Sequence, residues 1–298
     1  MKKIGVIVNP NAGRKLAPQR AEELQELLSL RGMKLSFHYT EAEEDLELVI
    51  SQMVPEVEQL VVMGGDGTVN EIVNGIVRQE IKHPLSIYPM GTVNDFATYL
   101  QIPKNIRDFS AMIHKNQQRK VDVGLAGDRY FLNVAAGGLL PELAHRVSSE
   151  AKTVLGKFAY YMEGIKEFPK QFFHPIPIQL EIQGKVETMD TLFFLAANSP
   201  YVGGFRNLVP GALVDDGLLD LLVVEAGELQ DMANVFFNFL RRQVEADVKP
   251  VRGMKHYRVR EFKLMSSEVV DVDTDGELGG YLPLSFTIVP KSLTLLVP

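Results

Sequence analysis

The sequence contains no cysteine among its 298 residues, so it can form neither a disulfide nor a thiolate metal site. No run of 18 apolar residues occurs, and that is the length a helix needs to cross a bilayer. Any contact with a membrane is therefore expected to be peripheral. The apolar part of the opening MKKIGVIVNP is too short for a signal peptide. These absences together favour a cytoplasmic protein.

Positive charge is also scarce, with 31 Lys and Arg against 38 Asp and Glu and a net charge of -7. A protein that binds by neutralising many nucleic-acid phosphates needs the opposite balance, so nucleic acid is not expected as a partner. The six histidines are scattered without metal-ligand spacing. The length and a hydrophobic content of 46% favour two cores of about 150 residues each.

The first 115 or so residues repeat one pattern: a short apolar run, a turn rich in Gly, Asn or Asp, and a stretch with helical periodicity. Strands that alternate with helices predict an α/β domain with a doubly wound parallel sheet. Ligands bind such sheets beyond the carboxyl ends of the strands. The turns at residues 9–13, 64–68 and 91–95 are all expected at that edge.

Further along the chain, closely spaced strands joined by Gly-Asp or Gly-Lys turns predict a mostly antiparallel second domain, a β-sandwich or flattened barrel. We expect residues 1–125 to form a nucleotide-binding domain and residues 126–298 a β-rich domain. The final strand, near residues 290–298, can pack back on the first domain. Two helical stretches, 152–168 and 229–244, interrupt the strands.

The three glycine-containing turns offer free backbone N–H groups beside helix starts, which suits phosphate binding. Neither the Walker sequence nor the dinucleotide fingerprint occurs in them. Together the turns could hold a triphosphate. Its charge must then be offset by something other than a P-loop lysine.

Asp66 stands between glycines in the second turn, where a carboxylate would repel phosphate. It becomes tolerable if a divalent cation lies between the two, directly or through water. Asp95 in the third turn and Asp122 at the domain junction could join the same cluster. The alternative is that Asp66 and Asp95 only cap helices.

Five segments in this order resemble the diacylglycerol kinase catalytic-domain family, which includes bacterial soluble lipid kinases and the sphingosine and ceramide kinases. They are NPNAG, GGDGTVNE, PMGTVNDF, LVPGALVDDGLLDLLVV and VDTDGELGG. GGDGT alone also occurs in NAD kinases, but the ordered set is specific. The likeness covers nearly the whole chain and is closest to the soluble diacylglycerol kinase of Gram-positive bacteria.

The resemblance implies phosphoryl transfer from ATP to a lipid hydroxyl, with Mg²⁺, in the cleft between the domains. It places Asp66, Asp95 and Asp122 in an aspartate and water network around magnesium. The residues that it predicts to contact ATP are Asn9, Pro10, Asn11, Ala12, Gly13, Thr40, Gly65, Asp66, Gly67, Thr68, Val69, Asn70, Glu71 and Thr92.

Asp275 and Glu277 alternate along a strand or its turn, so one can face the cleft while the other supports it. The family resemblance assigns the catalytic base to this pair without deciding which member accepts the proton. The alternative is a hairpin turn at Asp275 and Gly276 with a solvent-facing glutamate.

Leu213, Asp216 and Leu218 match the spacing of a magnesium site in these kinases, where the leucines supply backbone carbonyls. Such a site would be structural. The alternative is a turn that leads into the strand 218–224.

A soluble kinase has to dock on the bilayer to reach diacylglycerol. The stretch around 152–168 interleaves aromatic residues with Lys152, Lys157, Lys166 and Lys170, a composition that suits anionic headgroups, and Lys15 could add to the patch. The stretch 229–244 is a lesser candidate. In both cases a helix packed on its own domain with solvated lysines is the alternative.

The leading hypothesis is an ATP-dependent diacylglycerol kinase that makes phosphatidic acid and associates peripherally with the inner face of the plasma membrane. A second enzyme hypothesis changes the acceptor to another lipid, such as phosphatidylglycerol or a long-chain base, or to NAD. A third is a lipid or nucleotide sensor that retains the fold without catalysis. Resemblance to the Gram-positive enzymes also suggests a homodimer.

Overall fold

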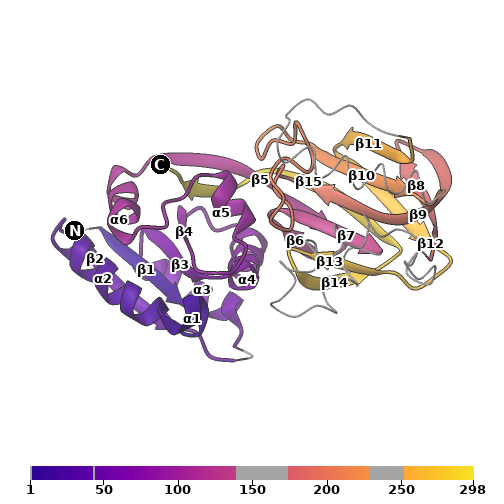
Figure 1. Ribbon diagram of the computed structural model, residues 1–298. Coiled ribbons are helices and arrows are strands. Elements are labelled where there is room, and N and C mark those ends of the chain that lie inside the picture. The colour runs from indigo at the N-terminus through magenta and orange to yellow at the C-terminus, as the bar shows by residue number, and fades with distance from the viewer. Residues whose placement is uncertain (1, 43, 139–173, 228–251) are drawn as a thin grey trace.

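The computed structural model describes residues 2–42, 44–138, 174–227 and 252–298, which form two lobes joined by long strands (Figure 1). The first domain has a parallel sheet in the order β4-β3-β1-β2. Its strands are β1 (Lys3–Val8), β2 (Lys34–Tyr39), β3 (Gln59–Gly64) and β4 (Leu85–Pro89). Every residue of β3 is buried, as expected for a central strand covered on both faces.

Helices follow the strands of this sheet, as the alternating sequence pattern predicts. They are α1 (Ala12–Lys15), α2 (Ala17–Ser29), α3 (Leu46–Met53), the short 3-10 helix η1 (Val54–Glu56), α4 (Asp66–Arg78), α5 (Asp95–Tyr99) and α6 (Ile106–Lys115). The helix α2 buries Ala21, Leu24 and Leu28, which recur at helical spacing. Asp45 and Asn105 cap α3 and α6 with side-chain hydrogen bonds to backbone N–H groups.

The second domain is a β-sandwich. Its strands are β6 (Arg129–Phe131), β7 (Val134–Gly138), β8 (Ile176–Ile182), β9 (Lys185–Ala197), β10 (Leu219–Glu225), β11 (Met254–Val259), β12 (Glu261–Ser266), β13 (Asp271–Thr274) and β14 (Glu277–Tyr281). The central strand β9 sends Phe194 and Ala196 into one core and Phe193 and Leu195 into another, because alternate side chains point to opposite faces.

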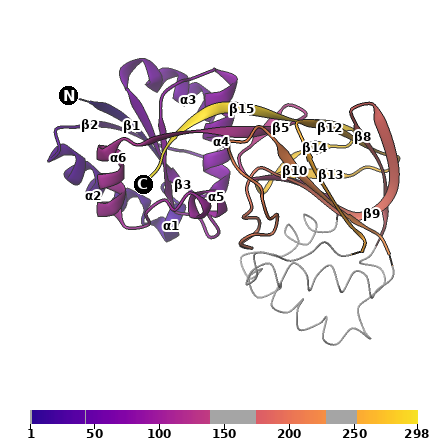
Figure 2. The same ribbon diagram turned by 90° about the horizontal axis from the view of Figure 1, so that it is seen from above.

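Two long antiparallel strands, β5 (Gln118–Ala126) and β15 (Leu284–Leu296), run from one domain to the other (Figure 2). The early part of β15 places Phe286 in a core of the sandwich, whereas Leu293 and Leu295 belong to the core of the first domain. Leu295 pairs with Leu85 of β4, so one continuous sheet connects the two domains. This shared sheet limits how far the domains can turn about each other.

The two helical stretches that we expect at a membrane surface, 152–168 and 229–244, lie outside the described residues. Within the described ranges, no helix has both the length and the apolar character required to span a bilayer.

Candidate active site

The three turns predicted at the carboxyl edge of the sheet are joined to one another by hydrogen bonds. Gly13 donates its backbone N–H to the carbonyl of Met90 at 3.0 Å, and Met90 donates to Gly64 at 2.9 Å. The side chain of Asn9 donates from Nδ2 to Oγ1 of Thr68 at 2.9 Å. Each turn therefore contacts the other two, and the three act as one structural unit.

Glycine is required where the second and third turns meet. A β-carbon built on Gly91 would lie 2.9 Å from the Cα of Gly65, closer than real β-carbons come to a backbone atom. The two glycines therefore allow the main chains to approach each other directly beside the start of α4. The N–H groups of that helix start remain available to an anion, which the helix dipole favours.

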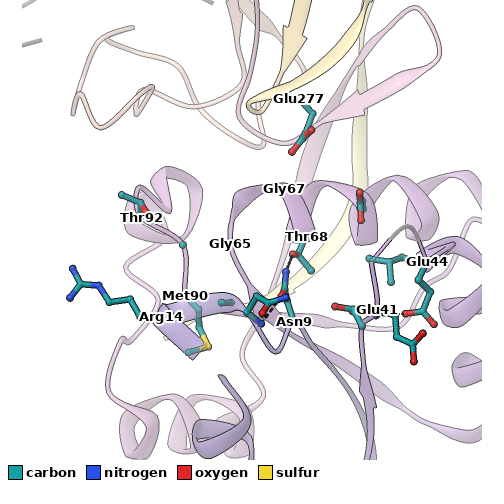
Figure 3. A pocket seen from close by; sticks show the side chains of 17 residues that line it. Asn9, Arg14, Glu41, Glu44, Gly65, Gly67, Thr68, Met90, Thr92 and Glu277 are labelled. Atoms are coloured by element: carbon teal, nitrogen blue, oxygen red, sulfur yellow. Dashed lines mark hydrogen bonds between the residues drawn. The ribbon is translucent and has the colours of Figure 1, made fainter. Parts of the chain in front are cut away.

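A pocket of about 890 Å³ opens along this edge (Figure 3). Eleven residues that the sequence predicts to act in binding or catalysis line it: Asn9, Asn11, Ala12, Gly13, Thr40, Gly65, Gly67, Thr68, Glu71, Thr92 and Glu277. Four residues that the resemblance assigns to ATP do not line it: Pro10, Asp66, Val69 and Asn70. Val69 and Asn70 are buried within the protein.

The pocket includes Gly91 of the third predicted turn, and it also includes residues that sequence reasoning missed, namely Arg14, Glu41, Glu44, Leu46 and Met90. Glu44 accepts hydrogen bonds from Nε2 of His38 at 2.9 Å and from the N–H of Glu41 at 3.1 Å, and these bonds lower its pKa. Both glutamates follow Thr40 at the end of β2. Their position at a strand's carboxyl end was the only signal that could have identified them.

Asp66 connects the second turn to the third. It is the first residue of α4, and its Oδ2 accepts from the N–H of Asn94 at 3.0 Å. Asn94 itself has a left-handed backbone and donates to Gly91. Burial raises the pKa of Asp66. A half-buried carboxylate beside an anion-binding turn suits a cation between them, as the sequence suggested.

Asp95 connects the third turn to the second domain. Both of its carboxylate oxygens lie near the N–H of Gly204, at 3.0 and 3.1 Å. Burial raises the pKa of Asp95 to about 6, and the charges of Asp66 and Asp275 add to that increase. Carboxylates from the second turn and from the second domain thus both act on Asp95 electrostatically.

Asp275 occupies the two-residue turn between β13 and β14. Asp275 and Gly276 have φ angles of 55° and 98°, as a tight hairpin turn requires. The carboxylate accepts hydrogen bonds from four groups: Nδ2 of Asn70 at 2.9 Å and the N–H groups of Leu132 at 2.6 Å, Asn133 at 2.9 Å and Val134 at 2.9 Å. Burial nevertheless raises its pKa to about 6. The hairpin alternative is therefore correct for the backbone, while the side chain points into the protein.

Glu277 follows two residues later and points the other way. It is exposed, lines the pocket, and lies above the first turn of α4 in Figure 3. Burial raises the pKa of Glu71, and the nearby charge of Glu277 raises it further. The predicted alternation thus holds: Glu277 faces the pocket and Asp275 is enclosed behind it.

Asp122 is fully buried in β5, where that strand crosses between the domains. Its Oδ1 accepts from the N–H of Lys291 at 2.7 Å and its Oδ2 from the N–H of Gly217 at 2.6 Å. Its charge acts on Asp216. The structure thus places Asp122 beside the loop of the predicted structural metal site, and a part in the network of Asp66 and Asp95 stays a prediction.

The loop that carries Leu213, Asp216 and Leu218 leads into β10, as the turn alternative predicts. Oδ1 of Asp216 accepts from the N–H of Leu218 at 3.0 Å, and Oδ2 forms an ion pair with Arg258. Arg258 also contacts the buried carboxylate of Asp220 at 3.3 Å. A guanidinium group therefore already supplies positive charge to Asp216, and magnesium binding here stays a prediction.

A magnesium ion at the phosphate-binding turns would need ligands beyond the protein. No group of three or more His, Cys, Asp or Glu side chains in the described part of the chain gathers closely enough to hold a metal. In kinases Mg²⁺ is typically bound by one or two carboxylates together with waters and substrate phosphates. Two mutually repelling carboxylates, the half-buried Asp66 and the buried Asp95, fit this kind of site.

Comparisons with known proteins identify both domains. Residues 3–126 match the diacylglycerol kinase catalytic domain, and residues 134–297 match the YegS C-terminal NAD kinase beta sandwich-like domain. The chain is 31% identical over 298 residues to the diacylglycerol kinase of Staphylococcus carnosus (strain TM300), covering 100% of the chain and 95% of that relative. Identity to the diacylglycerol kinase of Staphylococcus aureus (strain Newman) is also 31%, covering 100% of the chain and 93% of the relative.

A crystal structure of a Bacillus anthracis (strain Sterne) protein assigned as a diacylglycerol kinase superimposes with a TM-score of 0.83. The two chains are 28% identical, and the match covers 100% of this chain and 95% of that one. The match thus extends over both domains and the strands between them. The chain therefore belongs to the diacylglycerol kinase catalytic-domain family of lipid kinases.

Proposed function

We propose that this protein is an ATP-dependent diacylglycerol kinase that transfers the γ-phosphoryl group to the lipid hydroxyl and forms phosphatidic acid. The observation that carries the proposal is the position of Glu277. It brings a carboxylate from the second domain to the pocket formed by the three turns. A kinase needs this combination of a phosphate site and a facing acid.

The turns would hold the nucleotide phosphates through backbone N–H groups at Gly65, Gly67 and Thr68, which line the pocket at the start of α4. Asp66 and Asp95 would hold Mg²⁺ with the phosphate oxygens and water. When bound, the ion supplies charge neutralisation on the transferred group. Arg14, on the opposite side of the pocket from Glu41 and Glu44, adds a positive charge near the phosphates.

The acceptor hydroxyl would enter from the side of Glu277. A carboxylate offers about four lone-pair positions, and Asp275 already accepts four hydrogen bonds, whereas the described residues give Glu277 no hydrogen-bond donor. In this conformation Glu277 is therefore the member of the pair that is free to accept a proton. Asp275 would hold the turn in place and add negative charge behind it.

Purified protein incubated with Mg-ATP and radiolabelled γ-phosphate tests the proposal. Separate reactions contain diacylglycerol, phosphatidylglycerol or a long-chain base in mixed micelles, or NAD in solution. We expect labelled phosphatidic acid as the main product. Label in another lipid would keep the kinase and change the acceptor, label in NAD alone would replace the lipid kinase, and no label in any acceptor would favour a sensor.

We also propose that the protein docks on the anionic inner face of the plasma membrane. Support comes from the sequence alone, because Lys152, Lys157 and Lys166 lie outside the described residues. Replacing the three lysines with glutamate should weaken sedimentation with anionic vesicles relative to neutral ones, since each lysine near the surface contributes about 1 kcal/mol. Unchanged binding would exclude this segment as the membrane-docking surface.

A homodimer is a further proposal from family resemblance, and light scattering of the purified protein tests it.

A further inference from the structure

Asn70 belongs to the GGDGTVNE segment, which the family resemblance assigns to ATP, but its surroundings are entirely protein. The residue is 1% exposed. Its Nδ2 donates to Oδ2 of Asp275 at 2.9 Å and to the carbonyl of Tyr130 at 3.1 Å, and its Oδ1 accepts from Nδ2 of Asn74 at 3.1 Å. Both donor hydrogens of this amide group have protein partners and its oxygen accepts from Asn74, so no donor remains for a nucleotide.

The helix that carries Asn70 also carries the phosphate-binding turn. Asn70 lies one turn after Asp66, the first residue of α4. In the first turn of the same helix, a β-carbon on Gly67 would lie 2.8 Å from Oε1 of Glu277. The helix therefore touches both members of the acid pair, Asp275 through a hydrogen bond and Glu277 through close packing.

We infer that Asn70 is a positioning residue, which ties the hairpin turn of Asp275 and Glu277 to the helix whose N-terminus faces the nucleotide phosphates. The inference rests on the proposed function, because it assigns Asn70 a part in the transfer step. In-line transfer requires the acceptor, its base and the phosphate within a narrow range of positions. A displacement of about 1 Å can cost about 100-fold in rate.

Asn74 provides a matched control on the same face of α4. It is also 1% exposed, and it exchanges two hydrogen bonds with the backbone of Tyr130, each of 2.9 Å. It makes no hydrogen bond to Asp275 among the described residues. Removing Asn74 thus takes away its hydrogen bonds to Tyr130 and to Asn70, but it leaves in place the bond that Asn70 donates to Asp275.

The test compares Asn70→Ala with Asn74→Ala by kcat, KM for ATP, the Kd of Mg-ATP from calorimetry, and Tm. We expect Asn70→Ala to lower kcat at least about tenfold while KM and Kd stay within about twofold. We expect Asn74→Ala to lower Tm about as much as Asn70→Ala does, but to keep kcat within about threefold of the wild-type value. Asn70→Ser, which keeps a hydroxyl donor, allows the same comparison if the alanine variant does not fold.

Two results would overturn the inference. A tenfold rise in KM and Kd with kcat retained would make Asn70 a nucleotide ligand. Equal losses of kcat in Asn70→Ala and Asn74→Ala would reduce its role to general packing.

A double-mutant cycle with Asp275→Ala, which removes the acceptor of the Asn70 hydrogen bond, tests the connection itself. If Asn70 acts through Asp275, adding Asn70→Ala to Asp275→Ala should lower kcat by less than about twofold. The full effect of Asn70→Ala in that background would contradict the inference. The calorimetric measurement needs no acceptor lipid, so it can be made even if the wild-type protein phosphorylates none of the acceptors and the proposed function fails. An unchanged affinity of Asn70→Ala for Mg-ATP supports the inference, and a lost affinity overturns it.

Discussion

Gly67 of α4 and Glu277 of β14 lie in direct contact across the two domains, since a β-carbon on Gly67 would come within 2.8 Å of Oε1 of Glu277. The two residues are joined by no hydrogen bond; the contact exists because the first has no side chain. Gly67 leaves room for the exposed carboxylate of Glu277 over the start of the helix that carries the phosphate-binding turn. The first prediction follows from this contact.

Gly67→Ala should displace Glu277 and lower turnover at least about tenfold, because a positioned acid-base group contributes about 100-fold or more. Steady-state turnover and circular dichroism of the folded variant measure the effect. In a Glu277→Ala background the methyl group of Gly67→Ala has no side chain to displace, so it should not lower turnover further. An equal loss in both backgrounds would mean that Gly67 acts only by letting the nucleotide approach.

Asp66→Ala and Asp275→Asn should each lower turnover at least about 100-fold, since both remove groups that stabilise charge or position the acceptor. Asp66→Asn separates two roles of that residue. The asparagine can still accept the hydrogen bond from Asn94 but carries no charge. If Asp66 neutralises the metal, both variants are equally impaired; near-normal turnover of Asp66→Asn would limit it to holding the third turn. Folded variants of Asp66 and Asp275 with normal turnover would place the active site elsewhere.

The unfolding free energy should depend on pH through Asp95, whose pKa rises from 3.8 to about 6 in the folded protein. The stability contributed by its neutral form is present below pH about 4 and is lost as the pH rises through about 6. Asp95→Asn cannot ionise. Between pH 4.5 and 7 the unfolding free energy of Asp95→Asn should therefore rise relative to that of wild type, by on the order of 1–3 kcal/mol.

Urea unfolding with EDTA at several pH values measures this difference. Asp108→Asn, at an exposed carboxylate in the first turn of α6, serves as the control for the loss of a carboxylate elsewhere in the same domain. A pH-independent difference between Asp95→Asn and wild type would show that Asp95 ionises in the folded protein as it does in the unfolded chain.

Arg258→Met should lower the unfolding free energy by about 1–2 kcal/mol, because it removes the guanidinium partner of the buried carboxylate of Asp220 and leaves only its contact with His256 among the side chains of the described residues. The exposed Arg260→Met provides a control. If the loop of Leu213, Asp216 and Leu218 binds Mg²⁺, the ion should raise the Tm of Arg258→Met more than that of wild type. Equal responses to Mg²⁺ would argue against the predicted structural metal site.

The sequence alone determined the strand, turn and helix alternation of the first domain and the antiparallel character of the second. Both follow from local periodicity and turn chemistry, which neighbouring residues set. Because parallel strands end at one edge, their order also predicted that the turns at Asn9, Gly64 and Gly91 meet there. The sequence also predicted that Asp275 and Glu277 point in different directions, because side chains two residues apart around a strand and its turn are set by local backbone geometry.

Only the tertiary structure decided which side chains become partners across the two domains. Asn70 donates a hydrogen bond to Asp275, 205 positions away in the sequence, although the resemblance assigned it to ATP. Asp122 accepts a hydrogen bond from Lys291 because β5 and β15 cross together between the domains, and another from Gly217 of the loop before β10. Such contacts depend on how separately formed elements pack, and hydrophobic periodicity carries no information about that packing.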